Sequence, residues 1–155
     1  MSDTHMPRGT RRLPAECLRR LSEADRILHA GDFTTVEVYE ELAKLAPVEG
    51  VAGNMDTADL RSILPPKLVV DVEGVRVGVV HDAGPAHGRA GRLAQAFPGC
   101  AAVVYGHTHV PEATLAGDVW ILNPGSPTER RSAPHHGMID LEVSSGHLDV
   151  RTYVL

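Results

Sequence analysis

Two kinds of hydrophobic pattern alternate along much of the chain and predict two kinds of element. Apolar runs within residues 27–32, 48–54 and 101–107 each lead into a glycine followed by Asp, Asn or His, which is typical of buried strands that open into loops. Apolar residues three or four apart around residues 13–21, 38–45 and 93–97 predict helices. Strands that alternate with helices indicate βαβ units and a largely parallel sheet.

A second pattern consists of strand-like segments paired across short turns. The pairs are residues 67–71 with 75–81, 113–115 with 119–122, and 138–143 with 148–154, and each turn contains glycine. Such pairs predict antiparallel hairpins. Together the two patterns predict an α/β fold with two stacked mixed β-sheets flanked by helices. With 155 residues and no repeat or linker, the chain is expected to form a single domain over residues 1–155.

Composition and charge exclude several classes of function. A net charge of −5 argues against duplex nucleic acid as a partner, because duplex-binding proteins need a basic face. No apolar run approaches the roughly 18 residues of a membrane span, and the polar start has no secretory character. A cytoplasmic protein without a membrane partner is therefore expected. Cys17 and Cys100 are expected to be reduced packing residues rather than a disulfide.

Polar residues with metal-ligand chemistry cluster where the strands are expected to end. The carboxyl ends of strands in an α/β sheet meet at one edge, so residues far apart in sequence converge there. Three of the candidates supply oxygen and four supply imidazole nitrogen, a set that suits Mn, Fe, Co, Ni or Zn better than Ca or Mg. The candidate ligands are Asp3, His5, Asp32, Asn54, His81, His107 and His109.

Seven ligands exceed the needs of one ion and predict a centre with two divalent cations. If Asp32 bridges the ions, each receives four protein contacts and keeps positions open for water and substrate. Two such cations outweigh the charges of Asp3, Asp32 and a bridging hydroxide, so the site would be locally positive in an acidic protein. A metal pair of this kind can clamp a phosphoryl group and generate hydroxide at neutral pH, which predicts hydrolysis of a phosphate ester.

Five short motifs and one turn occur in an order that a known family shares: Ser2-Asp3-Thr4-His5, Gly31-Asp32, Gly53-Asn54-Met55-Asp56, His81, Gly106-His107-Thr108-His109 and Asn123-Pro124-Gly125-Ser126. With these motifs, which span nearly the whole chain, the sequence resembles the calcineurin-like metallophosphoesterases, and within them the small bacterial and archaeal phosphodiesterases. The resemblance implies the same fold of two sheets flanked by helices.

The resemblance also implies how the ligands are shared and what the site does. One ion would be held by Asp3, His5, Asp32 and His109, and the other by Asp32, Asn54, His81 and His107. The implied activity is metal-dependent phosphodiester hydrolysis with a metal-bound hydroxide as nucleophile and a small phosphate ester as substrate. Manganese is the metal expected, with Fe, Ni, Co or Zn as alternatives, and the resemblance allows a homodimer.

The sequence departs from the family pattern beside two ligands. Larger relatives carry a histidine directly after the Gly-Asn pair, whereas Met55 stands there in this chain. With no general acid in view, we expect a preference for diesters or good leaving groups. Asp56 is expected to orient the ligands from behind. Asp82 follows His81, where it could orient that histidine or crowd the second ion, and a structural role stays equally open.

No substrate-binding residue is assigned from the sequence. Several cationic side chains follow His81 or the Asn-Pro-Gly-Ser turn, and for each of them a solvated surface position is favoured over contact with phosphate. These residues are His87, Arg89, Arg92, Arg130 and Arg131.

The start of the chain is the third departure from the family. Members carry a full apolar strand before the Asp-x-His motif, whereas only Met1 and Ser2 precede Asp3 here, so the first strand is expected to be truncated. Asp3 and His5 are then expected on a fraying terminus with little backbone support. Either the chain begins late or the first ion site is weak.

The alternative to an enzyme is a catalytically weak or inactive scaffold that binds protein. Eukaryotic sorting complexes contain a phosphoesterase-like subunit with that role, and a fold does not settle a function. A scaffold is expected to have lost ligands, whereas all seven ligand types are present in this chain. Retention of the full set favours the enzyme.

Overall fold

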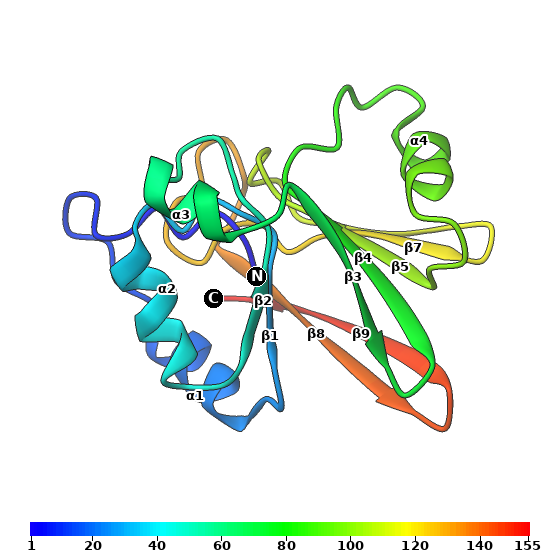
Figure 1. Ribbon diagram of the computed structural model, residues 1–155, viewed down its shortest axis with the longest axis horizontal. Coiled ribbons are helices and arrows are strands. Elements are labelled where there is room, and N and C mark those ends of the chain that lie inside the picture. Colours follow the sequence, from blue (N-terminus) through cyan, green and yellow to red (C-terminus); the bar gives the residue numbers. More distant parts are fainter.

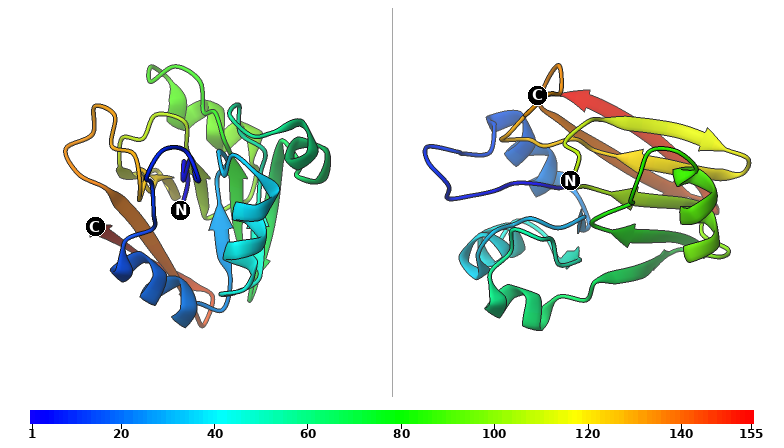
Figure 2. Two further views of the ribbon diagram at one scale, coloured as in Figure 1. Left: turned by 90° about the vertical axis from the view of Figure 1, so that its left-hand side faces the viewer. Right: turned by 90° about the horizontal axis from the view of Figure 1, so that it is seen from above.

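The computed structural model describes residues 1–155, and its elements form four layers (Figures 1 and 2). The helices are α1 (Ala15–Glu23), α2 (Val36–Ala43), α3 (Ala58–Ile63) and α4 (Arg89–Ala96). The strands are β1 (Ile27–His29), β2 (Val48–Gly50), β3 (Lys67–Val72), β4 (Val75–Val80), β5 (Ala102–Tyr105), β6 (Glu112–Ala116), β7 (Val119–Asn123), β8 (Gly137–Ser144) and β9 (His147–Val154).

A five-stranded mixed sheet forms one of the two inner layers. Its strand order is β3-β4-β5-β7-β6, with parallel pairing of β4 with β5 and of β5 with β7, and antiparallel pairing at both margins. Strand β5 is buried along its whole length, which explains its uninterrupted apolar run. The three hairpins expected from the sequence are confirmed as β3–β4, β6–β7 and β8–β9.

The other inner layer is divided into two pieces. Strands β1 and β2 form a parallel pair, and β8 and β9 form a separate antiparallel pair. The expected second sheet is therefore present as two two-stranded units, and no ladder joins β1 to β8. A groove of about 430 Å³ lies between them, with Leu28 and Leu141 among its walls and Val104 of the five-stranded sheet beneath.

Three hydrophobic clusters hold the layers together. Helices α1, α2 and α3 pack on the outer face of the two-stranded units through residues such as Leu21, Leu42 and Leu60. The two units contact the five-stranded sheet through a second cluster that includes Val77. Phe97, at the end of α4, belongs to the third cluster, which covers the opposite face of that sheet. None of the helices has the length and apolar character needed to cross a bilayer.

The N-terminal segment is firmly attached, so the expectation of a fraying terminus is wrong. Residues 1–5 are at most 7% exposed. The Met1 ammonium donates to Leu28 O (2.8 Å) and Met1 O accepts from Ala30 N (2.9 Å), as in a parallel strand pair. The amides of Asp3 and His5 donate to the carbonyls that follow β1, at 2.9 and 3.1 Å. Although residues 1–5 form no assigned strand, this backbone pairing positions both side chains.

Candidate metal centre

The structure brings all seven predicted ligands to the carboxyl edge of the strands. Asp3 and His5 lie on the N-terminal segment, and the other five lie on the loops that leave four strands. Asp32 follows β1, Asn54 follows β2, His81 follows β4, and His107 and His109 follow β5. Because these strands run in the same direction, residues separated by up to 106 positions in the sequence meet at one place.

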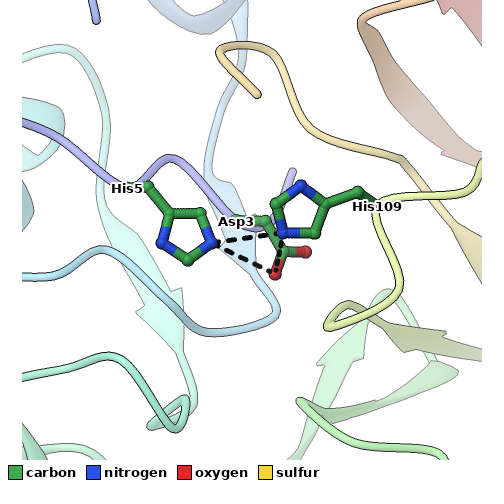
Figure 3. A group of neighbouring side chains, drawn as sticks. All are labelled: Asp3, His5 and His109. Atoms are coloured by element: carbon green, nitrogen blue, oxygen red, sulfur yellow. Dashed lines mark hydrogen bonds and ion pairs between the residues drawn. The ribbon is translucent and has the colours of Figure 1, made fainter. Parts of the chain in front are cut away.

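One group consists of Asp3, His5 and His109, shown in Figure 3. The Nε2 atoms of the two histidines are 3.2 Å apart, and an oxygen of Asp3 lies 3.3 Å from His109 Nε2 and 3.9 Å from His5 Nε2. All three side chains are almost completely buried. The three donor atoms lie within 4.8 Å of one another, as ligands of one cation do.

A second group consists of Asp3, Asp32 and His81. Asn54 lies beside it. Its Oδ1 atom lies 2.9 Å from His81 Nε2 and 2.9 Å from His107 Nδ1. Asp32 Oδ2 lies 3.4 Å from His81 Nε2 and 3.5 Å from His5 Nε2. Asp32 Oδ2 therefore lies within 3.5 Å of an imidazole nitrogen from each group.

The charges of the site are buried without a cationic side chain to balance them. Asp3 and Asp32 are 0% and 1% exposed, and neither forms an ion pair with lysine or arginine. Burial opposes the charge of Asp32, but the hydrogen bond and charge of His81 outweigh it and hold the pKa of Asp32 below its usual range. Buried carboxylates are costly unless a cation compensates them, and these two face imidazole nitrogens. This donor set fits a bound divalent cation.

Backbone carbonyls orient two of the imidazoles. His81 Nδ1 lies 2.8 Å from Ala30 O, and His109 Nδ1 lies 2.6 Å from Glu129 O. A proton on each of these nitrogens would leave Nε2 free to bind a cation, which is a common arrangement for metal-ligating histidine. His5 differs, because its Nδ1 is buried without a hydrogen-bond partner.

Asp56 connects the loops of the site through hydrogen bonds to their backbone amides. Its carboxylate accepts hydrogen bonds from the backbone amides of Asp32 (3.2 Å), Thr34 (2.7 Å) and Gly53 (2.7 Å), and the residue is 3% exposed. Burial raises the pKa of Asp56 despite these hydrogen bonds. Asp56 thus joins the loop after β1 to the loop after β2, which carry the candidate ligands Asp32 and Asn54.

The Asn-Pro-Gly-Ser turn supports the N-terminal segment and the loop after β5. Ser126 Oγ donates to Asp3 O (2.7 Å), and Ser2 Oγ donates to Gly125 O (2.9 Å). Asn123 Nδ2 donates to Gly106 O (3.0 Å), directly before His107. The turn therefore holds the peptide bonds around ligands rather than contributing ligands of its own.

Backbone strain is concentrated at the candidate ligands. Five of the seven have positive φ angles between 44° and 67°, a region that residues other than glycine seldom occupy. Such conformations cost of order 1 kcal/mol or more each and persist where the surrounding structure imposes them. The five are Asp3, His5, Asp32, His107 and His109.

Two glycines allow the loops to approach closely enough for the side chains to meet. A Cβ atom on Gly53 would overlap the carboxylate and backbone nitrogen of Asp32. A Cβ atom on Gly106 would lie 2.7 Å from Asp3 Oδ2 and 2.8 Å from Ala30 O. Neither position accepts a side chain without displacing a ligand.

Asp82 makes its side-chain hydrogen bond within its own loop. The residue is exposed, and its carboxylate accepts a hydrogen bond from Gly84 N (2.7 Å), so it closes its own loop. It lies in neither group of candidate ligands and forms no hydrogen bond with His81. The structure therefore favours a turn-forming role for Asp82.

The cationic side chains near the site are largely engaged by the protein itself. Arg89 pairs with Glu112 (3.1 Å), and Arg92 donates to the carbonyls of its own loop. Arg130 bonds to Pro134 O (3.0 Å), and Arg131 bonds to His107 O (3.2 Å).

Sequence reasoning missed Glu129. Its carbonyl contacts His109, and its carboxylate lies 3.8 Å from His5 Nε2. The same carboxylate pairs with Arg11 at 2.6 Å. An acidic residue three positions after the Asn-Pro-Gly-Ser turn was the only available signal, and it is too common to have singled out Glu129.

Comparison with known proteins places the chain in a family. A model of the calcineurin-like phosphoesterase superfamily domain matches residues 1–146. The chain is 34% identical over 151 residues to a probable metallophosphoesterase of Methanothermobacter thermautotrophicus, covering 96% of this chain and 87% of that protein. A Thermotoga maritima protein solved by NMR is 33% identical with a TM-score of 0.78, covering 100% of this chain and 96% of that one.

More distant structures share the fold. Vps29 of Entamoeba histolytica in complex with Zn²⁺ has a TM-score of 0.77 at 23% identity, covering 99% of this chain and 96% of that one. A structure described as a novel archaeal phosphodiesterase has a TM-score of 0.68 at 22% identity, covering 100% and 97%.

The chain belongs to the calcineurin-like phosphoesterase superfamily. This membership supports a phosphoesterase hydrolase that depends on divalent metal, and the structure contains candidate ligand groups for such ions.

Proposed function

We propose that the protein is a metal-dependent phosphodiesterase with a two-metal centre, most suited to Mn²⁺. The observation that carries the proposal is the gathering of seven oxygen and nitrogen donors, two of which are buried carboxylates with no lysine or arginine beside them. Asp3, His5, Asp32 and His109 would hold one ion, and Asp32, Asn54, His81 and His107 the other. When bound, the two cations supply Lewis acidity toward a phosphoryl group and acidify a water molecule.

The protein's own contribution is to fix the geometry of these donors. Ala30 O and Glu129 O orient the rings of His81 and His109, and Asp56 fixes the loops that carry Asp32 and Asn54. Strained backbone and close glycine contacts hold the donors in place before substrate arrives, so little reorganisation is needed during the reaction. The chain carries a net charge of −5, so attraction of an anionic substrate depends on local positive charge at and beside this site.

The preference for diesters follows from the residue next to Asn54. Met55 is 39% exposed and carries no proton to donate to a leaving group. A substrate with an activated leaving group does not need that proton. The reacting phosphate of a diester carries a single negative charge, so the site has less substrate charge to neutralise. The fold shared with an archaeal phosphodiesterase is consistent with this reaction.

Hydrolysis of bis(p-nitrophenyl) phosphate by metal-stripped protein, with and without added Mn²⁺, tests the proposal. We expect activity that requires Mn²⁺ and falls at least about a hundredfold in Asp32→Asn, because this substitution removes the charge of the bridging ligand. Asp149→Ala removes an exposed carboxylate on β9 and should leave activity unchanged. Calorimetric titration with Mn²⁺ should give two sites in the wild type. A folded protein that binds no Mn²⁺ and hydrolyses nothing would instead favour the protein-binding scaffold.

A further inference from the structure

Arg8 is the only arginine of the chain whose guanidinium makes no hydrogen bond or ion pair. Arg11, three residues further on, pairs with Glu129 at 2.6 Å, and Arg12 donates to Arg11 O at 2.7 Å. The remaining arginines contact a carboxylate or a backbone carbonyl, at distances up to 3.5 Å in Arg61. Arg8 is exposed, so its charge is available to an anion from solution.

Arg8 lines an open pocket of about 300 Å³ at the edge of the candidate metal centre. The other lining residues are His5, Pro7, Thr34 and Met55. His5 also belongs to the group of Asp3 and His109, so the pocket begins where the reacting phosphate would be held. Its volume is enough for one substituent of a small phosphate ester rather than for a polymer.

The walls of the pocket combine apolar surface with Thr34, whose hydroxyl has no hydrogen-bond partner. Pro7 and Met55 supply apolar contact, and Thr34 Oγ1 is buried without a hydrogen-bond partner. Thr34 has a φ angle of 102°, which is unusual for a β-branched residue, and Asp56 holds its amide at 2.7 Å. Strained residues with unmet hydrogen-bonding capacity are a feature of ligand sites.

We propose that this pocket binds the ester substituent of the substrate, and that Arg8 pairs with a second anionic group, a phosphate or carboxylate, carried by that substituent. This inference rests on the proposed phosphodiesterase function and names its substrate class. A guanidinium presents parallel N–H donors that match two oxygens of such a group. The reacting phosphate is held by the metal centre, so the free charge of Arg8 selects for a further anion.

A matched pair of substrates tests this selection: thymidine 5′-(p-nitrophenyl phosphate) with and without a 3′-phosphate. Both release the same leaving group and differ only in the second anion. We expect the wild type to have a lower KM for the 3′-phosphorylated ester. Arg8→Ala should raise that KM roughly tenfold or more with little change in kcat, and should leave the KM of the other ester within about twofold. Arg8→Lys should retain part of the selectivity.

Arg12→Ala is the matched control, since Arg12 lies in the same exposed loop but does not line the pocket. It removes the same charge and should leave the selectivity intact. Equal KM values for the two esters in the wild type, or an equal shift for both in Arg8→Ala, would overturn the inference. Loss of selectivity in Arg12→Ala would also do so, because it would indicate a general charge effect.

Binding separates this inference from the proposed function. Thymidine 3′,5′-bisphosphate and thymidine 5′-monophosphate can be titrated calorimetrically into Mn²⁺-loaded protein without any turnover. We expect tighter binding of the bisphosphate in the wild type and loss of that difference in Arg8→Ala. If no ester is hydrolysed while this difference is present, the phosphodiesterase proposal fails and the Arg8 site stands. If hydrolysis occurs without the difference, the Arg8 site fails alone.

Discussion

Replacement of Asp56 by alanine is expected to destabilise the protein and weaken its metal centre together. The substitution leaves three backbone amides, those of Asp32, Thr34 and Gly53, without their acceptor. A buried donor left unsatisfied costs about 1–3 kcal/mol, so three would cost about 3–9 kcal/mol if none found a new partner.

Two effects place the expected loss near the lower end of this range. Burial raises the pKa of Asp56, which means that desolvation already offsets part of the energy of its hydrogen bonds. Water can also reach some of the amides once the side chain is gone. We therefore expect Asp56→Ala to lower the free energy of unfolding by about 3 kcal/mol. Asp56→Asn keeps one acceptor oxygen and should lose about half as much.

Urea denaturation of the metal-free protein measures this loss directly. Asp59→Ala is the control, because Asp59 is exposed in the first turn of α3, where its replacement should change stability by less than about 0.5 kcal/mol. Calorimetry should show Mn²⁺ affinity reduced about 10- to 100-fold in Asp56→Ala. A variant as stable as the wild type that also binds Mn²⁺ equally well would refute the view that Asp56 fixes the two ligand loops.

Two further predictions concern a glycine and the N-terminus. Gly53→Ala should displace Asp32 and reduce Mn²⁺ affinity by at least about tenfold in calorimetric titration. Gly91→Ala, in α4 with open space around it, should leave Mn²⁺ affinity unchanged and raise stability by about 0.5–1 kcal/mol. Equal Mn²⁺ affinities of the two variants would contradict the close-approach argument. Burial lowers the pKa of the Met1 ammonium from 8.0 to about 6. The unfolded chain therefore binds more protons between these values, and the free energy of unfolding should rise with pH from 6 to 8 by about 2 kcal/mol from this group. The pKa of His81 is raised, so His81 makes the free energy of unfolding fall with pH instead. Urea unfolding of the metal-free protein should therefore be measured across this pH range with and without N-terminal acetylation. The same dependence of the free energy of unfolding on pH in both samples would exclude the Met1 ammonium as its cause.

The convergence of the seven candidate ligands could be predicted from sequence because it depends on local signals and a general rule of topology. Asp32, Asn54 and His107 each follow a short apolar run and a glycine, and parallel strands bring their exits together. The hairpins could be predicted for a similar reason, since turn residues lie next to the strands they join. Both kinds of signal act over a few residues.

The supporting contacts could not be predicted, because they join backbone groups that no residue type marks. The hydrogen bond from Thr34 N to Asp56 and the contact of His109 with Glu129 O depend on how loops pack in three dimensions. The division of the second layer depends on which strands lie beside β1, a question of pairing between distant segments that apolar patterns do not answer. Helix α3 could not be predicted from the apolar pattern, because it is only six residues long and buries a single residue, Leu60.

The positive φ angles of the ligands carry a consequence for attempts to engineer this protein. Glycine occupies such conformations freely, so substitutions such as His107→Gly would relieve backbone strain at the moment they remove a donor. A thermostability screen would then tend to enrich variants that have lost candidate metal ligands. Directed evolution of this fold should therefore select for retained metal affinity in every round, with heat resistance as a second criterion.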